Sequence, residues 1–221
     1  MSFENLVLIP SIIDTPNIEL SYTATRSVYS RKERYEQTKK TISSIREKIP
    51  DCKILVVECC LLDEEETIYF SKNTDYFINL FDTPYRSNIY SISKSMGEGT
   101  MTAIALEYIL KNNITFKNLI KISGRYWLND NFNYSVIEQN KIYVRRICPL
   151  SACTALYSIP YSLLNPFYIF IVSSKEDFIN CVGYESIFGK FLSTIHEEYI
   201  KYVSILGFSG YISICGDFIE A

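Results

Sequence analysis

Residues 118–130 read Asn-Leu-Ile-Lys-Ile-Ser-Gly-Arg-Tyr-Trp-Leu-Asn-Asp, and the predicted fold is built around them. A short run of Leu and Ile ends at Ser123 and Gly124, and Arg125 follows directly with a Tyr and the only Trp of the chain. Such a run is typical of a buried central strand that delivers polar groups to the carboxyl edge of a sheet, where open α/β folds bind ligands. Arg125 is therefore the first candidate binding residue. The alternative is that Arg125 and its aromatic neighbours only cover the sheet edge.

Alternating strand and helix signals precede this stretch. Three apolar runs predict strands, at 5–13, 53–60 and 76–80. Ser30 and Glu33 match a capping box, which predicts a helix that runs to about Lys48, and the acids at 63–66 suit the first turn of a second helix. This order predicts an α/β fold with a doubly wound, mostly parallel sheet that is Rossmann-like in its N-terminal half.

A helix before the central strand carries further candidate groups. It follows a polar loop at 81–93 and becomes helical from about Gly97 onward. Gly97 and Gly99 would let backbone amides approach a ligand at the helix start, and Lys94 adds a positive charge there. The order of these residues is not that of a phosphate-binding P-loop, so a plain helix cap is the alternative interpretation.

The pattern changes after Asp130. Strands are predicted at 141–147 and 154–159, helices at 161–172 and 184–199, and two short strands within 202–216. Glu185 falls in the first turn of the last helix, where the helix dipole alone would explain an acid. We therefore expect a mixed C-terminal half.

Composition argues against several classes of protein. A formal net charge of −3 leaves no basic excess for a nucleic-acid polymer, although the basic residues within 26–48 suit a small anionic ligand. Seven Cys without a Cys-x-x-Cys pair, together with one His, indicate buried free thiols in a reducing compartment rather than a zinc site or a disulfide framework. We see no secretion signal and no apolar run approaching ~18 residues, so we expect a soluble cytoplasmic protein without a membrane span.

The order of elements resembles the GT-A fold of nucleotide-sugar-dependent glycosyltransferases. In that family the second strand ends in a carboxylate that touches the base, and Glu58 matches this place; the alternative for Glu58 is a solvated acid at a strand end. An Asn-x-Gly segment and a small-residue helix precede the fourth strand, and residues 94–97 and 100–105 look similar. The resemblance implies one domain, 1–221, with a nucleotide-binding half at 1–130 and an acceptor-side half at 131–221.

The sequence departs from the family at the end of the fourth strand. Ser123-Gly124-Arg125 stands where the family has Asp-x-Asp, which holds a divalent metal against the donor diphosphate. The segment also resembles the Lys-Ile-Ser/Thr-Gly-Arg-Tyr segments of viral and bacterial sugar-transfer proteins. Arg125, with Lys94 and Arg26, could replace Mn²⁺ or Mg²⁺ in neutralising the leaving group. The same departure would also fit a degenerate, inactive fold.

The resemblance implies roles for the remaining candidates. Residues 183–186 resemble the segment that carries the catalytic base, which makes Glu185 the candidate base and Asp130 a weaker alternative for base or metal ligand. Tyr126 and Trp127 would form a platform for the sugar or acceptor. His196, beside two acids, is expected to be a solvated helix residue, and Asp217 has no assigned role.

The implied activity is transfer of a sugar from a nucleoside-diphosphate sugar to a glycan or other hydroxyl acceptor. Two alternatives remain. A sugar nucleotidyltransferase usually has a Gly-rich basic loop after the first strand, and residues 12–16 contain no Gly. A non-catalytic binding or assembly module would keep the fold without needing its pocket charges.

Overall fold

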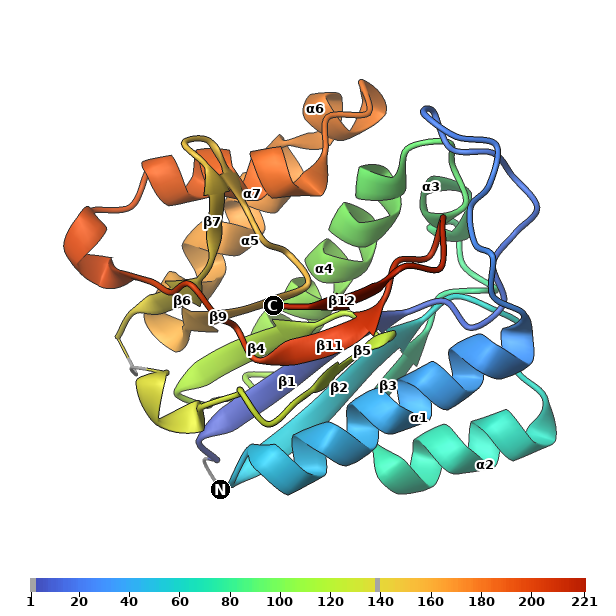
Figure 1. Ribbon diagram of the computed structural model, residues 1–221, viewed down its shortest axis with the longest axis horizontal. Coiled ribbons are helices and arrows are strands. Elements are labelled where there is room, and N and C mark those ends of the chain that lie inside the picture. The colour runs from blue at the N-terminus through green and yellow to red at the C-terminus, as the bar shows by residue number, and fades with distance from the viewer. Residues whose placement is uncertain (1–2, 138–139) are drawn as a thin grey trace.

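A seven-stranded sheet forms the centre of the computed structural model, which describes residues 3–137 and 140–221 (Figure 1). Its parallel part contains β3 (Tyr76–Asn79), β2 (Cys52–Glu58), β1 (Asn5–Ser11) and β4 (Asn118–Ile122), in that spatial order. Beyond β4 lie β9 (Leu156–Pro160), β6 (Ile142–Val144) and β10 (Ile200–Tyr202). β9 is antiparallel to β4 and β6, whereas β10 is parallel to β6. The expected α/β fold with a mostly parallel sheet is confirmed.

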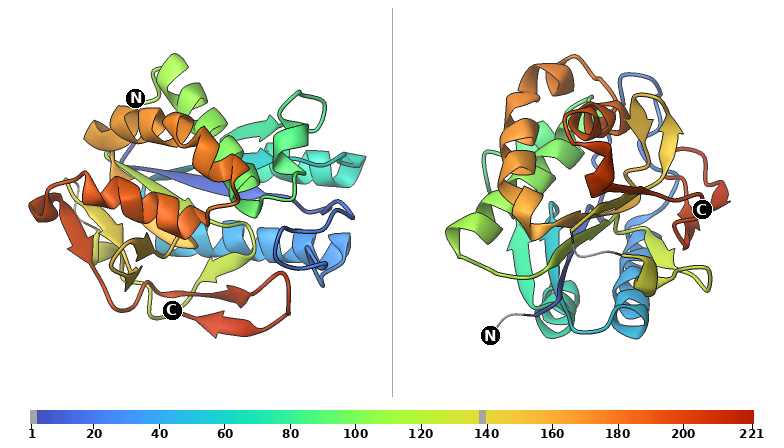
Figure 2. Two further views of the ribbon diagram at one scale, coloured as in Figure 1. Left: turned by 90° about the horizontal axis from the view of Figure 1, so that it is seen from above. Right: turned by 90° about the vertical axis from the view of Figure 1, so that its left-hand side faces the viewer.

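Helices cover both faces of this sheet (Figure 2). One face carries α1 (Arg31–Lys48) and α2 (Glu64–Asn73), and the other carries α4 (Lys94–Lys111), α5 (Leu164–Ser173) and α7 (Tyr184–Ser193). Successive side chains of a strand point to opposite faces, so Leu6 and Leu8 join the core on the α4 side, while Val7 and Ile9 join the core on the α1 side. Burial on both faces explains why β1 and β4 read as nearly continuous apolar runs.

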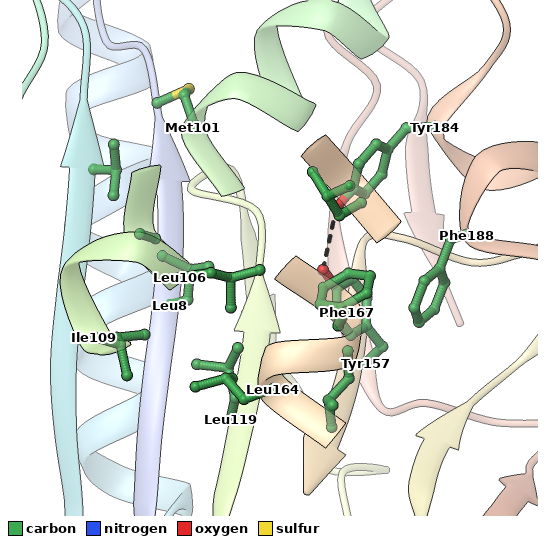
Figure 3. Packing of buried hydrophobic residues seen from close by; sticks show 14 of the residues in the cluster. Leu8, Met101, Leu106, Ile109, Leu119, Tyr157, Leu164, Phe167, Tyr184 and Phe188 are labelled. Carbon is green, nitrogen blue, oxygen red and sulfur yellow. Dashed lines mark hydrogen bonds between the residues drawn. The ribbon is translucent and has the colours of Figure 1, made fainter. Parts of the chain in front are cut away.

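Aromatic side chains from the C-terminal half pack against α7 and α5 (Figure 3). The ring of Tyr157 in β9 lies 4.4 Å from that of Phe188, measured between centroids, and Phe167 meets Tyr157 edge-on. The hydroxyl groups of Tyr157 and Tyr184 lie 3.5 Å apart. These buried contacts fix the N-terminal end of α7 against the sheet.

A three-stranded antiparallel sheet packs along α1 (Figure 1). It consists of β5 (Tyr126–Leu128), β11 (Phe208–Tyr211) and β12 (Phe218–Glu220). Thr41 of α1 donates to the Tyr126 carbonyl at 2.7 Å, so β5 runs back along α1 after the chain leaves β4. Smaller elements complete the described chain: α3 (Arg86–Ile89), α6 (Lys175–Ile179), the β7 (Arg146–Cys148) and β8 (Ser151–Ala152) hairpin, and 3-10 helices at Tyr134–Val136, Tyr161–Leu163 and Glu197–Tyr199.

Several element bounds differ from the sequence predictions. α4 begins at Lys94 rather than near Gly97, because Ser93 Oγ accepts a hydrogen bond from the Met96 amide and caps the helix earlier. The strand predicted over 141–147 divides into β6 and β7. The helix predicted over 184–199 ends at Ser193, where the next backbone hydrogen bonds tighten to the 3-10 pattern.

Two further predictions concern the cysteines, expected as buried free thiols, and the absence of a membrane span. All seven cysteines are free, but Cys148 and Cys215 are exposed rather than buried. Among the helices of residues 3–137 and 140–221, none is long and apolar enough to cross a membrane.

Candidate functional site

Two neighbouring cavities lie where β1 and β4 end. The inner cavity, about 90 Å³, is lined by charged and polar residues that include Arg26, Arg34, Lys94, Glu98, Ser123 and Arg125. The outer cavity, about 210 Å³, is lined by residues that include Tyr22, Lys94, Glu98, Tyr184 and Glu185. Together they place side chains from α1, α4, α7 and the end of β4 at the carboxyl edge of the parallel strands, the usual ligand position in open α/β sheets.

The turn after β4 directs Arg125 into the inner cavity. The Gly124 amide donates to the Pro10 carbonyl at 3.1 Å, and the Gly124 carbonyl accepts from Thr38 Oγ1 at 2.8 Å. A Cβ atom at this position would stand 3.0 Å from Ser11 Cβ, so a glycine lets the turn pack closely against β1. The turn is thereby fixed to both β1 and α1.

The Arg125 guanidinium keeps donor capacity inside this cavity. Its Nη2 donates to the Tyr126 hydroxyl at 3.3 Å, whereas its buried Nε has no hydrogen-bond partner among the described residues. No carboxylate in residues 3–137 and 140–221 lies within ion-pair distance of it. An unpaired buried donor on a cation favours an anionic ligand.

Together with burial, the charge of Arg125 lowers the pKa of two neighbouring cations, Lys94 and Arg34. Burial, and then the charge of Arg125, lower the pKa of Lys94 to about 8 and that of Arg34 to about 10. Burial also acts against the charge on Arg125 itself, but its contact with Tyr126 and the charges of Glu98 and Glu185 leave its pKa raised. The repulsion among the three cations therefore appears as a lowered pKa of Lys94 and of Arg34. A bound anion would reduce this repulsion.

Glu98 is a site residue that the sequence predictions missed. Its carboxylate accepts from the ammonium of Lys121, whose side chain has no exposed surface and which also donates to Ser123 Oγ at 2.9 Å and to the Thr154 carbonyl. Burial alone would raise the pKa of Glu98, but the charge of Lys121, with those of Lys94 and Arg125, holds that pKa below its ordinary value. A signal existed, because a lysine inside the apolar run of β4 requires a buried partner.

Glu185, the predicted base, lines the outer cavity. It is exposed in the first turn of α7, and its Oε1 accepts from Thr154 Oγ1 at 3.2 Å. Tyr22, from the loop after β1, lies across the cavity, and burial followed by the charge of Glu185 raises the pKa of Tyr22. The structure therefore brings Arg125, Lys94 and Glu185 to one place.

Arg26 lines the inner cavity, and three of its five N–H donors bond to backbone carbonyls. Its Nε, Nη1 and Nη2 donate to the carbonyls of Ile18, Ile89 and Ser91, respectively. Arg26 therefore joins two loops at the cavity wall, and because a guanidinium has five N–H donors, a contact between Arg26 and a diphosphate stays a prediction.

Glu58 is neither solvated nor accessible in this conformation. Its side chain has no exposed surface, and its Oε1 accepts from the amides of Ile13 at 3.2 Å and Cys59 at 2.8 Å. Burial raises the pKa of Glu58, and its Oε2 has no partner within the described part of the chain. The solvated-acid alternative is wrong, and a contact between Glu58 and a base stays a prediction that requires this carboxylate to become exposed.

The glycines of α4 serve packing rather than amide exposure. The Gly97 amide donates to the Ser93 carbonyl at 3.3 Å, and a Cβ atom on Gly97 would stand 2.9 Å from the Ile89 carbonyl. At Gly99, a Cβ atom would stand 2.4 Å from the Phe178 ring. Gly97 still lines the inner cavity, but it does so by letting α3 approach α4.

The aromatic platform and Asp130 lie elsewhere than expected. Tyr126 is buried in the core and reaches the site only through its hydroxyl contact with Arg125. Trp127 lines two other cavities along α1, where Lys40 Nζ stands 3.4 Å from its ring centroid. Asp130 is exposed and pairs at 3.1 Å with Lys48, the last residue of α1. Neither site cavity includes Trp127, predicted as part of the sugar or acceptor platform, or Asp130, predicted as an alternative base or metal ligand and as an acceptor-side residue.

Divalent-metal ligands are not gathered at this site. Ser123 accepts from Lys121, and Arg125 is a cation, whereas Mg²⁺ and Mn²⁺ prefer carboxylate and other oxygen ligands. Among the residues that the structure describes, no three or more His, Cys, Asp or Glu side chains form a group that could hold a metal ion. The donor set that replaces Asp-x-Asp does not fit a metal. His196 is exposed as expected, with its Nδ1 3.2 Å from Glu198 Oε1, but it lies just before the 3-10 helix at Glu197–Tyr199 rather than within a helix.

Solved structures, rather than sequences, provide the comparison. Neither a protein-family model nor a curated protein matches the sequence. A candidate nucleotide-diphospho-sugar transferase from Desulfovibrio desulfuricans G20 superposes with a TM-score of 0.52 at 4% identity, over 91% of this chain and 80% of that one. The fold is GT-A-like. An identity of 4% supports this statement about the fold and nothing finer.

Two further structures have lower scores. The glycosyltransferase GlyE of Streptococcus pneumoniae TIGR4 gives a TM-score of 0.49 at 10% identity over 91% of this chain, which spans only 45% of GlyE. A glycosyltransferase involved in the glycosylation of the major capsid of PBCV-1 gives 0.48 at 11% identity, over 92% of this chain and 84% of that one.

Proposed function

We propose that the protein is a glycosyltransferase that moves a sugar from a nucleoside-diphosphate sugar to a hydroxyl group of a glycan or other acceptor. The observation that carries this proposal is the meeting of Arg125, Lys94 and Arg34 at the inner cavity, where burial and mutual repulsion act on the cations. A diphosphate supplies the negative charge that such a group of cations lacks. The GT-A-like fold supports the nucleotide-sugar class.

The leaving group is the part of the reaction that the cations serve. When the bond between the anomeric carbon and the diphosphate oxygen breaks, the electron pair leaves with the nucleoside diphosphate. Preorganised cations in a partly buried site stabilise that charge as it develops. Arg125 and Lys94 would do so without a metal ion, in agreement with the donor set at the end of β4.

Glu185 is the proposed base. It lies in the outer cavity, next to the border that Lys94 and Glu98 share with the inner one. The acceptor oxygen attacks the anomeric carbon, and its proton passes to the Glu185 carboxylate. Thr154 holds the Glu185 Oε1 atom and so limits the orientations of this carboxylate.

A donor-turnover assay tests the proposal. Purified protein is incubated with UDP-, GDP- and CDP-sugars, with EDTA or with Mn²⁺, and released nucleoside diphosphate is measured. We expect release from one nucleotide class, equal with EDTA and with Mn²⁺, and lost at least ~100-fold in Arg125→Ala. Arg46→Ala is the matched control, because Arg46 pairs with Asp75 away from both cavities. Complete dependence on Mn²⁺, or no binding of any nucleotide sugar, would contradict the proposal, and binding without turnover would favour the non-catalytic module.

A further inference from the structure

Lys94 and Glu98 line both cavities, so they mark the border between them. The inner cavity holds the remaining cations, and the outer cavity holds Glu185. During the proposed transfer the sugar ring lies between the leaving diphosphate and the acceptor. The border residues are therefore the ones that a bound donor sugar would contact.

Glu98 is arranged as a hydrogen-bond acceptor toward that border. Its Oε1 accepts from Lys121, and no hydrogen bond to its Oε2 occurs in the described ranges. The Glu98 side chain is 20% exposed, whereas the Lys121 side chain is 0% exposed. Lys121 thus holds the Oε1 atom of Glu98, and the Oε2 atom can still accept a hydrogen bond from a ligand.

Lys121 is fully committed to holding this arrangement. An ammonium group has three donors, and those of Lys121 meet Glu98, Ser123 and the Thr154 carbonyl. No donor remains for a ligand, and the side chain is buried. Lys121 is therefore a positioning residue that keeps Glu98 ionised and oriented.

We propose that Glu98 binds hydroxyl groups of the donor sugar and thereby selects a neutral sugar over one that carries a carboxylate. This inference rests on the proposed function and adds the class of donor sugar. Hydroxyl groups donate well to a fixed carboxylate, whereas a uronate would meet like charge at the same position. Lys94 does not reverse this preference, because the diphosphate of the same ligand engages its ammonium in the proposed complex.

The test separates the sugar from the nucleotide. Affinities are measured by calorimetry for UDP against UDP-glucose and for GDP against GDP-mannose, with wild type and Glu98→Gln. We expect Glu98→Gln to leave nucleoside-diphosphate affinity unchanged or tighter and to weaken the nucleotide sugar ~10-fold, the size expected for a charged hydrogen bond. Glu107→Gln is the matched control, since Glu107 pairs with Lys111 further along the same helix.

The outcomes distinguish this inference from the function beneath it. If none of UDP, GDP and CDP binds the wild type, the proposed function fails, and this inference fails with it. If a nucleoside diphosphate binds but Glu98→Gln does not change the ratio of the two affinities, only the inference fails. UDP-glucuronate binding as tightly as UDP-glucose to the wild type would also overturn it.

A second variant guards against misfolding. Glu98→Gln leaves the buried Lys121 without a counter-charge, so Glu98→Gln/Lys121→Met, which removes both charges, is measured alongside and should show the same loss of sugar affinity.

Lys121→Met alone tests the positioning role of Lys121 through the pH dependence of affinity. Without Lys121 the pKa of Glu98 rises, so the advantage of the nucleotide sugar over the nucleoside diphosphate should fade at a higher pH than in the wild type. An unchanged pH profile would show that Lys121 is only structural.

Discussion

The carboxylate of Glu98 accepts a hydrogen bond from Lys121, a lysine with no exposed surface in the middle of the central strand. This contact joins α4 to β4, and the bond from Lys121 to the Thr154 carbonyl extends it toward β9. A buried charge is retained only where it is paired and hydrogen-bonded. The ion pair of Glu98 and Lys121 therefore lines the proposed site and also connects α4 to the sheet.

Breaking this ion pair from its two sides should have unequal effects. Glu98→Gln leaves a fully buried ammonium without a counter-charge and should lower the free energy of unfolding by about 3 kcal/mol. Lys121→Met leaves a carboxylate that still reaches solvent, so its effect should be smaller, and the double variant should recover part of the loss. Urea unfolding of the three variants measures this; a double variant equal to the sum of the single ones would argue against a coupled pair.

Lys94 should make ligand affinity depend on pH. Its pKa of about 8 means that it loses its charge as the pH rises through that value. Affinity for a nucleoside diphosphate should fall between pH 7.5 and 8.5, a window in which the diphosphate is fully ionised and the bases of UDP and GDP remain almost entirely neutral, and Lys94→Arg should flatten this profile. Calorimetry at several pH values is the measurement, and a wild-type profile that matches the Lys94→Arg profile would count against a role for this ammonium.

As the pH rises, titration of Lys94 should increase the free energy of unfolding, whereas it should decrease ligand affinity. An unfolded lysine titrates near ~10.4, so between about 8 and ~10.4 the ligand-free folded protein binds fewer protons at Lys94 than the unfolded chain does. The contribution of Lys94 to the free energy of unfolding should therefore increase as the pH rises through this window. Urea unfolding of wild type and Lys94→Met at pH 7.5 and 9.5 isolates this contribution.

Glu185 should matter for turnover and not for donor binding. Glu185→Gln keeps the hydrogen bond from Thr154 but removes the basic group, so transfer should slow ~10²–10⁴-fold with nucleotide affinity unchanged. Single-turnover kinetics under saturating donor measure this step. Equal transfer rates for the variant and the wild type would assign the base elsewhere.

Trp127 should be dispensable for nucleotide binding. Its ring packs against Tyr211 and Phe218, with centroids 5.8 and 6.1 Å away, and neither site cavity includes it. Trp127→Ala should lower the free energy of unfolding by about 2 kcal/mol through lost packing of β11 and β12 and leave nucleoside-diphosphate affinity within about twofold. A large loss of affinity with unchanged stability would place this ring at the ligand after all.

Local patterns predicted the strands, the layers and the first helix. The capping box is present as expected: the Ser30 amide donates to Glu33 Oε2 at 2.8 Å, and Ser30 Oγ accepts from the Glu33 amide. Arg125 also reaches the ligand edge, because a short apolar strand followed by Gly fixes where its next residues emerge. These features depend on neighbours within a few positions, which a sequence displays directly.

The predictions for the residues that follow the turn at Gly124 did not match the structure. Gly124 reverses the chain, so β5 returns along α1, and alternation along a strand puts Tyr126 in the core and Trp127 on the opposite side. Asp130, at the end of this return, lies beside Lys48 and lines neither site cavity. Glu98 was missed because its partner, Lys121, is distant in sequence. Such contacts depend on tertiary packing.

Calorimetric titration of nucleoside diphosphates in the presence of EDTA tests the central claim most directly. Wild type, Arg125→Gln and Arg46→Ala are each titrated with UDP, GDP and CDP. We expect wild type and Arg46→Ala to bind one of these without metal, and Arg125→Gln to bind it at least ~10-fold more weakly. Equal affinity in Arg125→Gln, or binding that appears only after Mn²⁺ is added, would contradict it.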